Sequence, residues 1–315
     1  MGFVFLVFVL VVLEFTVNIR LYDLERQDKS QIEGNYTMSQ YTDLMYLLSE
    51  GNLADIYGHR ATIKYGFDAF IKESPESILE IGYGLGNFSI LLSKKYPMAK
   101  IVGVDSNIHS VTVANEFLRK QGGGSDEIQN VSLEYRETPQ LAEPDKHYDV
   151  IVTNFVNHHI FPDENFITFL KNVARVGKKY FIFNDFERSL FCITSNYLLF
   201  SSFKEYGAEA VLDIANKYSP FPMSVESSES INAYRDILRT GKRPKESLDL
   251  LFDGGMLSMR RSFSMKEYKK LFQAAGYPED SLKCQSLFRP SDPLSYTCRV
   301  VCVADLTFAK SVGDS

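Results

Sequence analysis

An acid and three glycines stand together in the stretch ESILEIGYGLGNFSI, residues 76–90. Glu80 lies near the end of an apolar run, and Gly82, Gly84 and Gly86 follow it within five positions. Glycine weakens regular structure, so three glycines in one turn indicate a place where the backbone must come close to something. A helix-like run, NFSILLSKKY, begins directly after the last glycine. A strand, a glycine turn and a helix in this order are typical of a turn that binds a nucleotide-like ligand.

A second acid, Asp105, ends the next apolar run, IVGVD, 25 residues after Glu80. In a parallel sheet that binds a nucleotide, the second strand presents an acid at this point to the ribose hydroxyls. A nicotinamide-binding turn would have glycines in the order GxGxxG, whereas this chain has GxGxG followed by Asn87. The pattern therefore favours a ribose-containing cofactor other than a dinucleotide.

Ionisable side chains follow two later apolar runs. NFVNHHIF contains His158 and His159, and FIFNDFERS contains Asp185 and Arg188. An imidazole changes its charge near neutral pH, so a histidine could act as a general base that takes a phenol or hydroxyl proton. Two adjacent histidines cannot easily both face a substrate, and we expect only one of them to act. A purely structural role for each histidine stays open.

The residues around Asp185 also have two interpretations. In the first interpretation these residues bind a ligand at the carboxyl edge of a sheet, where α/β proteins have their ligand sites. The residues would be Asn184, Asp185 and Arg188, with Arg260 or Arg261 closing over them. Alternatively, Asp185 forms a structural ion pair with Arg188 or Arg261 that fixes the segment covering this edge. A buried pair keeps its partners in place, so the two interpretations are compatible.

These groups must be positioned by a regular alternation of elements. Residues 31–73 are helix-like, and from residue 76 strand-like and helix-like runs alternate as far as KKYFIFND. Such alternation predicts an α/β fold with a mostly parallel sheet between two layers of helices. The alternation stops over residues 190–258, which are too long for an ordinary connection and are predicted to form an inserted helical cap. A helix and two late strands, SLKCQSLF and TCRVVCVADLTF, complete the pattern.

Composition excludes some partners and suggests a compartment. The chain has 315 residues and a net charge of −6, and it lacks the runs of Lys and Arg that non-specific nucleic-acid binding requires. We therefore expect no nucleic-acid partner. Cys298 and Cys302 would be about 13 Å apart on one strand, too far to bridge each other. All four cysteines are interpreted as reduced thiols of a cytoplasmic protein.

The N-terminus is an apolar segment, MGFVFLVFVLVVL, interrupted by Glu14. It lacks the basic start and the cleavage site of a secretory signal, and it is short for a membrane-spanning helix. Three alternatives stay open: a membrane-associating helix within residues 1–20, an apolar helix packed on the domain, or an ill-defined start. We divide the chain into this segment, residues 1–30, and one domain, residues 31–315.

The motif EIGYGLG, residues 80–86, resembles the first motif of the class I S-adenosylmethionine-dependent methyltransferases, and the resemblance extends over residues 31–310. NFVNHHIF is similar to the His-His segment of the ubiquinone/menaquinone-type small-molecule branch. FIFNDFERS and FDGGMLSMRRSFSMKEYKKLFQAAGY resemble segments of bacterial small-molecule methyltransferases. Some of those enzymes are found beside polyketide synthases and act on aromatic or quinone-like acceptors.

The resemblance implies a Rossmann-like, doubly wound sheet of seven strands with an antiparallel last strand. It also implies S-adenosylmethionine as cofactor, whose ammonium and carboxylate groups require an acid and a close-approaching backbone. Asp105 would chelate the ribose hydroxyls, and the strand after it would end near the adenine, at a segment, RETPQ, that departs from the family pattern. The implied cofactor-binding residues are Glu80, Gly82, Tyr83, Gly84, Gly86, Asp105, Ser106, Asn107, Glu137, Thr138, Asn154 and Phe155.

The function that the resemblance implies is methyl transfer to a small-molecule acceptor, an aromatic hydroxyl in the first interpretation, without a metal ion. The expected catalytic residues on the acceptor side are His158, His159, Asp185 and Arg188. Two alternatives are C-methylation of a quinone or lipid precursor, and a non-catalytic protein that keeps the fold and binds the cofactor or a partner.

Overall fold

The computed structural model describes residues 55–108, 110–112, 114–115, 128–136, 141–189, 191–193, 258–287 and 299–310. The apolar N-terminal segment and almost all of the predicted cap lie outside these residues, as do Glu137 and Thr138. Within the described ranges, no helix has both the length and the apolar character needed to cross a membrane.

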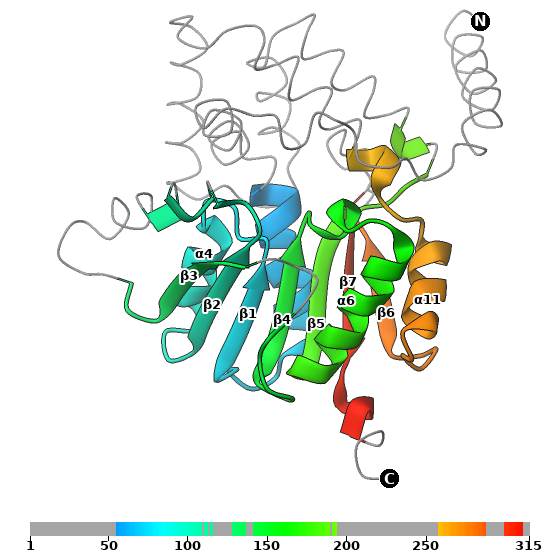
Figure 1. Cartoon of the computed structure of the whole chain (residues 1–315). Coiled ribbons are helices and arrows are strands. Elements are labelled where there is room, and N and C mark those ends of the chain that lie inside the picture. Colours follow the sequence, from blue (N-terminus) through cyan, green and yellow to red (C-terminus); the bar gives the residue numbers. More distant parts are fainter. Residues whose placement is uncertain are drawn as a thin grey trace, which may run out of the picture.

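A seven-stranded sheet forms the centre of the fold (Figure 1). Its strand order is β3-β2-β1-β4-β5-β7-β6, and β7 runs antiparallel to both neighbours while the pairs from β3 to β5 are parallel. This confirms the predicted Rossmann-like sheet. The strands are β1 Ser77–Ile81, β2 Lys100–Asp105, β3 Val131–Tyr135, β4 Tyr148–Asn154, β5 Gly177–Phe186, β6 Leu282–Ser286 and β7 Arg299–Asp305.

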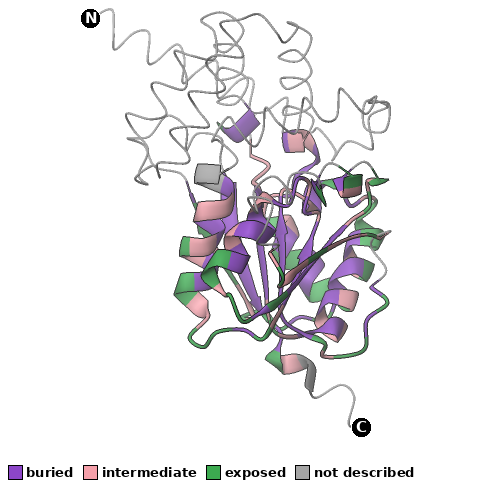
Figure 2. Ribbon diagram, turned by 90° about the vertical axis from the view of Figure 1, so that its left-hand side faces the viewer, coloured by how far each residue is buried: buried purple, intermediate pink, exposed green. Residues whose placement is uncertain are grey.

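Helices cover both faces of this sheet, which explains why the central strands are almost continuously apolar (Figure 2). One face packs against α6 (Asp163–Val176) and α11 (Met265–Ala274), and the other against η2 (Thr62–Phe67) and α4 (Asn87–Lys95). All seven residues of β4 are buried. The remaining described helices are short: η1 Asp55–Arg60, α3 Asp68–Phe70, η3 Asn157–His159 and η5 Thr307–Lys310.

Aromatic side chains fill the space between the sheet and the α6–α11 layer. Phe166 lies 4.8 Å from Phe263 and Phe183 lies 5.0 Å from Tyr268, measured between ring centres. Each such side chain stabilises the fold by about 1.5–3 kcal/mol through burial. This layer fixes residue 263 beside the end of β5, where Phe263 pairs with Glu187. The cluster consists of Phe166, Phe169, Phe181, Phe183, Phe263, Tyr268 and Phe272.

A buried polar network attaches the N-terminal helical segment to the ends of β4 and β5. The Thr62 hydroxyl lies 2.6 Å from the Asn154 side-chain oxygen and 2.8 Å from the Gly58 carbonyl. Asn184 donates to the same carbonyl and to the Thr62 oxygen, at 2.9 and 3.2 Å. Because buried polar groups are costly without partners, these bonds fix the register of the segment on the sheet.

The cysteine interpretation was wrong for two residues. Cys284 of β6 and Cys302 of β7 stand directly opposite each other and form a disulfide, with their Cα atoms 4.0 Å apart. The spacing of Cys298 and Cys302 concerns two cysteines within one strand, whereas antiparallel pairing brings residues of neighbouring strands together. Cys192 is a buried thiol outside any disulfide of the described residues, and its sulfur accepts a hydrogen bond from the Ser189 hydroxyl. The cysteines therefore give no support to a reducing compartment.

Replacing Thr62 by Val should lower the free energy of unfolding by about 1–3 kcal/mol, because two buried amide side chains lose a partner. Urea denaturation measures this change. Thr168 provides a matched control: it is exposed on α6 and donates to the Glu164 carbonyl at 2.9 Å. Thr168→Val should cost less than about 0.5 kcal/mol. Equal losses in the two variants would contradict the role assigned to the network.

Candidate active site

The ionisable residues singled out from the sequence gather at the carboxyl ends of β1, β2, β4 and β5, the upper edge of the sheet in Figure 1. The strand order reverses between β1 and β4, because β2 lies on one side of β1 and β5 lies on the far side of β4. Open parallel sheets bind their ligands at such a point of reversal. The edge is therefore the candidate site.

The glycine turn adopts a backbone that other residues would not tolerate. Gly82, Gly84 and Gly86 have φ values of 76°, 55° and 80°. A Cβ atom on Gly82 would come within 2.3 Å of the Val156 side chain. The turn is closed by the Gly86 N–H, which donates to the Tyr83 carbonyl at 2.8 Å, and α4 begins immediately afterwards. The Tyr83 ring is buried over Gly103 of β2, so Tyr83 faces the turn through its backbone.

Glu80 places a buried carboxyl group beneath this turn. The group is 2% exposed, and Ser89 of α4 donates a hydrogen bond to it. Burial raises the pKa of Glu80 to about 7, the Ser89 bond opposes this, and the Asp105 charge adds to it. A positively charged ligand group near Glu80 would favour the ionised form.

Asp105 ends β2 beside the glycine turn, and backbone N–H groups hold it in place. Its Oδ2 accepts from the Gly84 N–H at 3.0 Å, and its Oδ1 accepts from the Asn107 N–H at 2.8 Å. Burial raises the pKa of the Asp105 carboxyl group, while these hydrogen bonds and one from Ser110 lower it. Each carboxylate oxygen can accept a second hydrogen bond, so the orientation suits a ligand with two hydroxyl groups.

Ile108 lies on the surface near Asp105 and was not among the site residues predicted from the sequence. Ile108 is 57% exposed, although it is large and apolar. Ser106 is also exposed, and Asn107 is half-buried. The signal in the sequence was the segment DSNI, in which an isoleucine stands three residues after Asp105, since an apolar ring of a ligand could cover such a side chain.

His158 and Asp185 form a buried pair at the ends of β4 and β5. The His158 Nδ1 lies 2.7 Å from Asp185 Oδ1, and the His158 backbone N–H donates to Oδ2 at 3.1 Å. The side chains are 2% and 0% exposed. A carboxylate accepts hydrogen bonds, so the neutral ring carries its proton on Nδ1 and Nε2 is the basic nitrogen. The geometry therefore orients an imidazole base.

The two adjacent histidines differ in burial and in the groups that their side chains face. His159 is exposed, and its ring centre lies 4.0 Å from that of His158. His159 is close enough to Asp105 for its positive charge to lower the pKa of that carboxyl group. His158 therefore faces β5, and His159 faces Asp105 at the end of β2.

Asn154 and Phe155 end β4 between these two sides. Asn154 is 8% exposed, and within the described residues its Nδ2 makes no hydrogen bond. Phe155 has a left-handed φ of 58°, which is unusual for a bulky residue, and its N–H donates to the Asn184 carbonyl at 2.8 Å. Its ring centre lies 5.3 Å from that of Phe186. The strained turn thus directs an aromatic ring toward the end of β5.

Arg188 does not join Asp185, and the ion pair between these residues that the sequence left open is not formed. The Arg188 Nε donates to the Ser262 carbonyl at 3.0 Å, and its Nη2 pairs with Glu267 of α11. Successive side chains of an extended chain point to opposite sides, so residue 188 faces away from residue 185. Arg188 attaches the end of β5 to the start of α11. Arg261 is buried and Arg260 is half-buried in the preceding turn.

Arg299 packs over two aromatic rings near the end of β5, and it was not among the residues selected from the sequence. Its guanidinium carbon is 4.5 Å from the centre of the Phe155 ring and 5.2 Å from that of the Phe186 ring. The residue is 8% exposed. Burial lowers the pKa of Arg299 to about 9, and the Asp185 charge opposes this, so the guanidinium stays charged at neutral pH. A single arginine in the otherwise apolar run CRVVCVA was the available signal.

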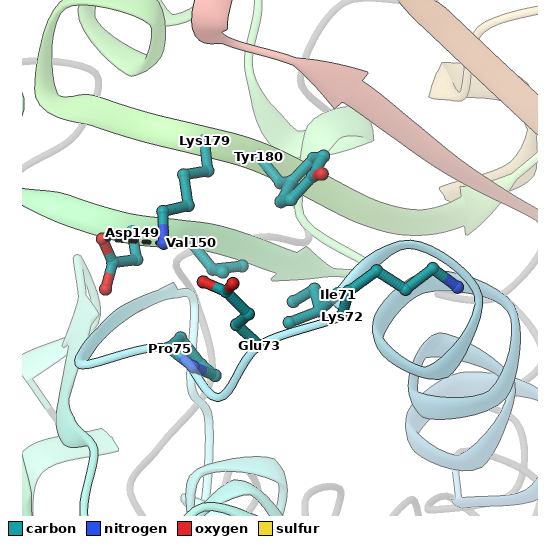
Figure 3. A pocket seen from close by; sticks show the side chains of 8 residues that line it. All are labelled: Ile71, Lys72, Glu73, Pro75, Asp149, Val150, Lys179 and Tyr180. Carbon is teal, nitrogen blue, oxygen red and sulfur yellow. Dashed lines mark ion pairs between the residues drawn. The ribbon is translucent and has the colours of Figure 1, made fainter.

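A separate pocket of about 190 Å³ lies at the opposite edge of the sheet (Figure 3). Its lining includes Asp149 and Lys179, near the amino ends of β4 and β5. The Lys179 Nζ lies 4.0 Å from the Asp149 Oδ1. None of the candidate site residues borders it. In the part of the chain that the structure describes, no group of three or more His, Cys, Asp or Glu side chains could hold a metal ion.

Comparison with known proteins supports a methyltransferase domain. Residues 78–179 match the family described as "Methyltransferase domain". Ajmaline N-methyltransferase of Rauvolfia serpentina is 25% identical over 149 residues, which cover 44% of this chain and 50% of that protein. Malonyl-[acyl-carrier protein] O-methyltransferase 2 of Ilyobacter polytropus is 31% identical over 131 residues, which cover 40% of this chain and 43% of that protein. The matches thus span about half the length of these curated relatives.

A solved structure shares the fold. The SAM-dependent methyltransferase of Aquifex aeolicus superposes with a TM-score of 0.50 at 14% identity, covering 86% of this chain and all of that one. At this level of identity the likeness concerns the architecture of the sheet and its helices.

Replacing Glu80 by Gln should make stability less dependent on pH. The pKa of Glu80 is raised in the folded protein from 4.5 to about 7, so the stability that the protonated group contributes is present below pH 4.5 and is lost as the pH rises through 7. At pH 8 the variant should be more stable than the wild type by up to about 3 kcal/mol, and below pH 4.5 the difference should vanish.

Thermal unfolding of the ligand-free protein between pH 4.5 and 8 measures this difference. Glu279 is exposed, and Glu279→Gln serves as the control that removes one carboxylate without removing a buried one. If Glu80→Gln and the wild type keep parallel stability curves over this range, the carboxyl group does not titrate near pH 7.

Proposed function

We propose that this protein is a class I S-adenosylmethionine-dependent methyltransferase that methylates a small molecule at an aromatic hydroxyl group, since residues 78–179 match the family described as "Methyltransferase domain". The observation that carries the proposal is the buried pair of His158 and Asp185 at the carboxyl edge of the sheet. Methylation of a hydroxyl group needs a base to remove its proton, and this pair supplies an oriented imidazole.

The residues at the glycine turn fit S-adenosylmethionine. Gly82 and Gly86 leave no space for a side chain, so the backbone of the turn can come close to a ligand. Glu80 is a buried acid whose pKa is raised to about 7, and the ammonium group of the methionine portion would hold it ionised. When bound, this cofactor supplies a methyl group attached to a positively charged sulfur.

Asp105 is placed to bind the ribose. Two backbone N–H groups fix both of its oxygens, and each oxygen keeps a lone pair for a cofactor hydroxyl. Ile108 supplies an exposed apolar surface that a flat adenine ring would cover. His159, which lies near Asp105, belongs to this side of the site.

His158 acts on the acceptor. Its Nε2 takes the hydroxyl proton, and the acceptor oxygen would then form the new bond to the methyl carbon as the carbon–sulfur bond breaks and its electron pair stays on the sulfur, which becomes neutral. Asp185 holds the ring by its Nδ1 and stabilises the imidazolium that forms, so the proton remains on His158 until solvent removes it. Phe155 and Phe186 supply an aromatic wall beside the pair, 5.3 Å apart between ring centres, against which an aromatic acceptor would pack.

The relatives do not indicate which atom of the acceptor is methylated, whereas the residues of this site favour an oxygen. The relatives named above include an N-methyltransferase and an O-methyltransferase. An amine that is neutral at working pH has a free lone pair and needs no base before it reacts. A buried imidazole oriented by a carboxylate therefore supports an oxygen acceptor over a nitrogen one.

Replacing Asp105 by Ala should weaken binding of S-adenosylhomocysteine by about tenfold to a hundredfold, the loss expected for a charge-assisted hydrogen-bond pair. Isothermal titration of the full chain measures it, with NADH as the ligand that should not bind. Asp280, an exposed acid on the far side of the domain, gives the control variant Asp280→Ala. Unchanged affinity in the Asp105 variant would exclude the ribose assignment.

Replacing His158 by Ala should reduce kcat by about a hundredfold or more while S-adenosylhomocysteine binds as in the wild type, because only the proton acceptor is lost. His159→Ala is the matched control and should keep most of the turnover. Methyl transfer from isotopically labelled cofactor to a panel of phenols, hydroxyquinones and amines gives the rates. A His158 variant with wild-type kcat would overturn the proposed base.

A further inference from the structure

The side chain of Asn154 is bound within the protein at one end and lacks a partner at the other. Asn154 ends β4 and is 8% exposed. The Thr62 hydroxyl of η2 lies 2.6 Å from its Oδ1, whereas its Nδ2 is buried and makes no hydrogen bond with any described residue. A buried donor without a partner costs free energy and is rare in folded proteins. This amide nitrogen is therefore a candidate for binding a ligand.

The contacts of Thr62 determine which end of the amide group is left over. The Thr62 hydroxyl has one proton, and two oxygens are within its reach, those of Gly58 and Asn154. The Gly58 carbonyl also accepts from Asn184 Nδ2 at 2.9 Å. The 2.6 Å distance to Asn154 is typical of an O–H donor and short for an N–H donor. Thr62 therefore donates to Oδ1, and the NH2 group of Asn154 faces away from Thr62.

The strand register places Asn154 beside the glycine turn. β1 and β4 are parallel neighbours, and their last pair is Ile81 with Thr153 (Figure 1). Gly82 and Asn154 are the next residues on these two strands, which lie about 4.8 Å apart. Side chains alternate between the faces of a strand, and Glu80 pairs with the residue two before Asn154, so both side chains are on one face. This is the face covered by η2 and α4, where Thr62 and Ser89 bond to them.

An acid and an amide donor on one face are complementary to the two ends of an amino acid. The methionine portion of S-adenosylmethionine carries an ammonium and a carboxylate group. An ammonium group has only donors, so the NH2 group of Asn154 cannot bind it, whereas a carboxylate accepts from such a donor. Glu80 is the group on this face that suits the ammonium.

We propose that Asn154 Nδ2 binds the carboxylate of the cofactor's methionine portion, and that Thr62 is a positioning residue that holds the amide by its oxygen and leaves the nitrogen for the ligand. The inference rests on the proposed function for the identity of the cofactor, but it does not depend on the acceptor. Thr62 precedes residues 78–179, which match the methyltransferase family. The N-terminal helical segment thus takes part in recognising the cofactor.

The test compares two ligands by isothermal titration of the full-length protein. One is S-adenosylhomocysteine, and the other is its decarboxylated analogue, which keeps the adenosine and the ammonium group but lacks the carboxylate. Asn154→Asp keeps an oxygen for the Thr62 hydroxyl and replaces the N–H donor by a second oxygen. Asn165→Asp is the matched control, because it makes the same change on an exposed residue of α6 whose Nδ2 donates to the Phe161 carbonyl.

We expect Asn154→Asp to weaken binding of S-adenosylhomocysteine by about tenfold to a hundredfold, the effect of losing a charge-assisted hydrogen bond. The decarboxylated analogue should bind this variant at least as tightly as it binds the wild type. Asp105→Ala removes the ribose contact common to both ligands and should weaken both by the same factor. Equal weakening of the two ligands in Asn154→Asp, or an unchanged affinity for S-adenosylhomocysteine, would overturn the proposal.

The positioning role of Thr62 is tested with the same two ligands. Thr62→Val should weaken binding of S-adenosylhomocysteine about threefold to tenfold more than binding of the analogue, because the amide loses its orienting hydrogen bond. Thr62→Ser keeps the hydroxyl group and should restore the wild-type ratio of the two affinities. A loss of stability alone changes both affinities together, so a wild-type ratio in Thr62→Val would overturn this role.

The wild type provides a second arm if a variant does not fold. It should bind S-adenosylhomocysteine at least about tenfold more tightly than the decarboxylated analogue, and equal affinities would overturn the proposal. No acceptor is present in these titrations, so failure of the proposed hydroxyl methylation would leave the expected pattern intact. A wild type that binds neither ligand would overturn the cofactor together with this inference, so the two kinds of failure are distinguishable.

Discussion

The arrangement of the acceptor side depends on one buried carboxylate, that of Asp185. It is fully buried at the end of β5 and accepts hydrogen bonds from the His158 ring, the His158 backbone and the Phe186 backbone. An ionised group in such surroundings is costly unless its oxygens are satisfied, so these bonds are a condition of the fold. They hold η3 against β5 and thereby determine where both histidines point. The chemistry of the edge follows from the way this charge is compensated.

The two buried acids of the site are compensated in different ways, and the difference separates their roles. Asp185 accepts three hydrogen bonds within the protein. Glu80 accepts a hydrogen bond from Ser89, and burial raises its pKa to about 7. The protein thus completes the environment of Asp185 by itself, as a group that orients a base requires. We propose that a positively charged group of the ligand completes the environment of Glu80, as a ligand-binding acid requires.

The sheet and the glycine turn could be predicted from the sequence because both are local. Alternating apolar runs imply a parallel sheet, and three glycines after a strand imply the left-handed turn that Gly82, Gly84 and Gly86 adopt. The partners of Asp185 could not be predicted in this way. Arg188 is close in sequence but points to α11, whereas Arg299 is distant and packs on Phe186 because β7 pairs antiparallel with β5. The same pairing of distant strands joins Cys284 to Cys302. Strand register decides these contacts, and register depends on the whole sheet.

The helical segment before the sheet belongs to the site for a related reason. Gly58 lies so close to Phe155 that an added Cβ atom would be 2.6 Å from its ring, and Thr62 bonds to the side chain of Asn154. The left-handed turn at Phe155 is therefore held from one side by this segment and from the other by the ring contact with Phe186. Strain at such a turn persists only when the surroundings fix it. Because Arg299 packs on the same two rings, the segment that fixes Phe155 also fixes the position of this guanidinium. The N-terminal helices and strand β7 thus act together on one pair of aromatic rings at the edge of the sheet, although about 240 residues separate Gly58 from Arg299 in the sequence.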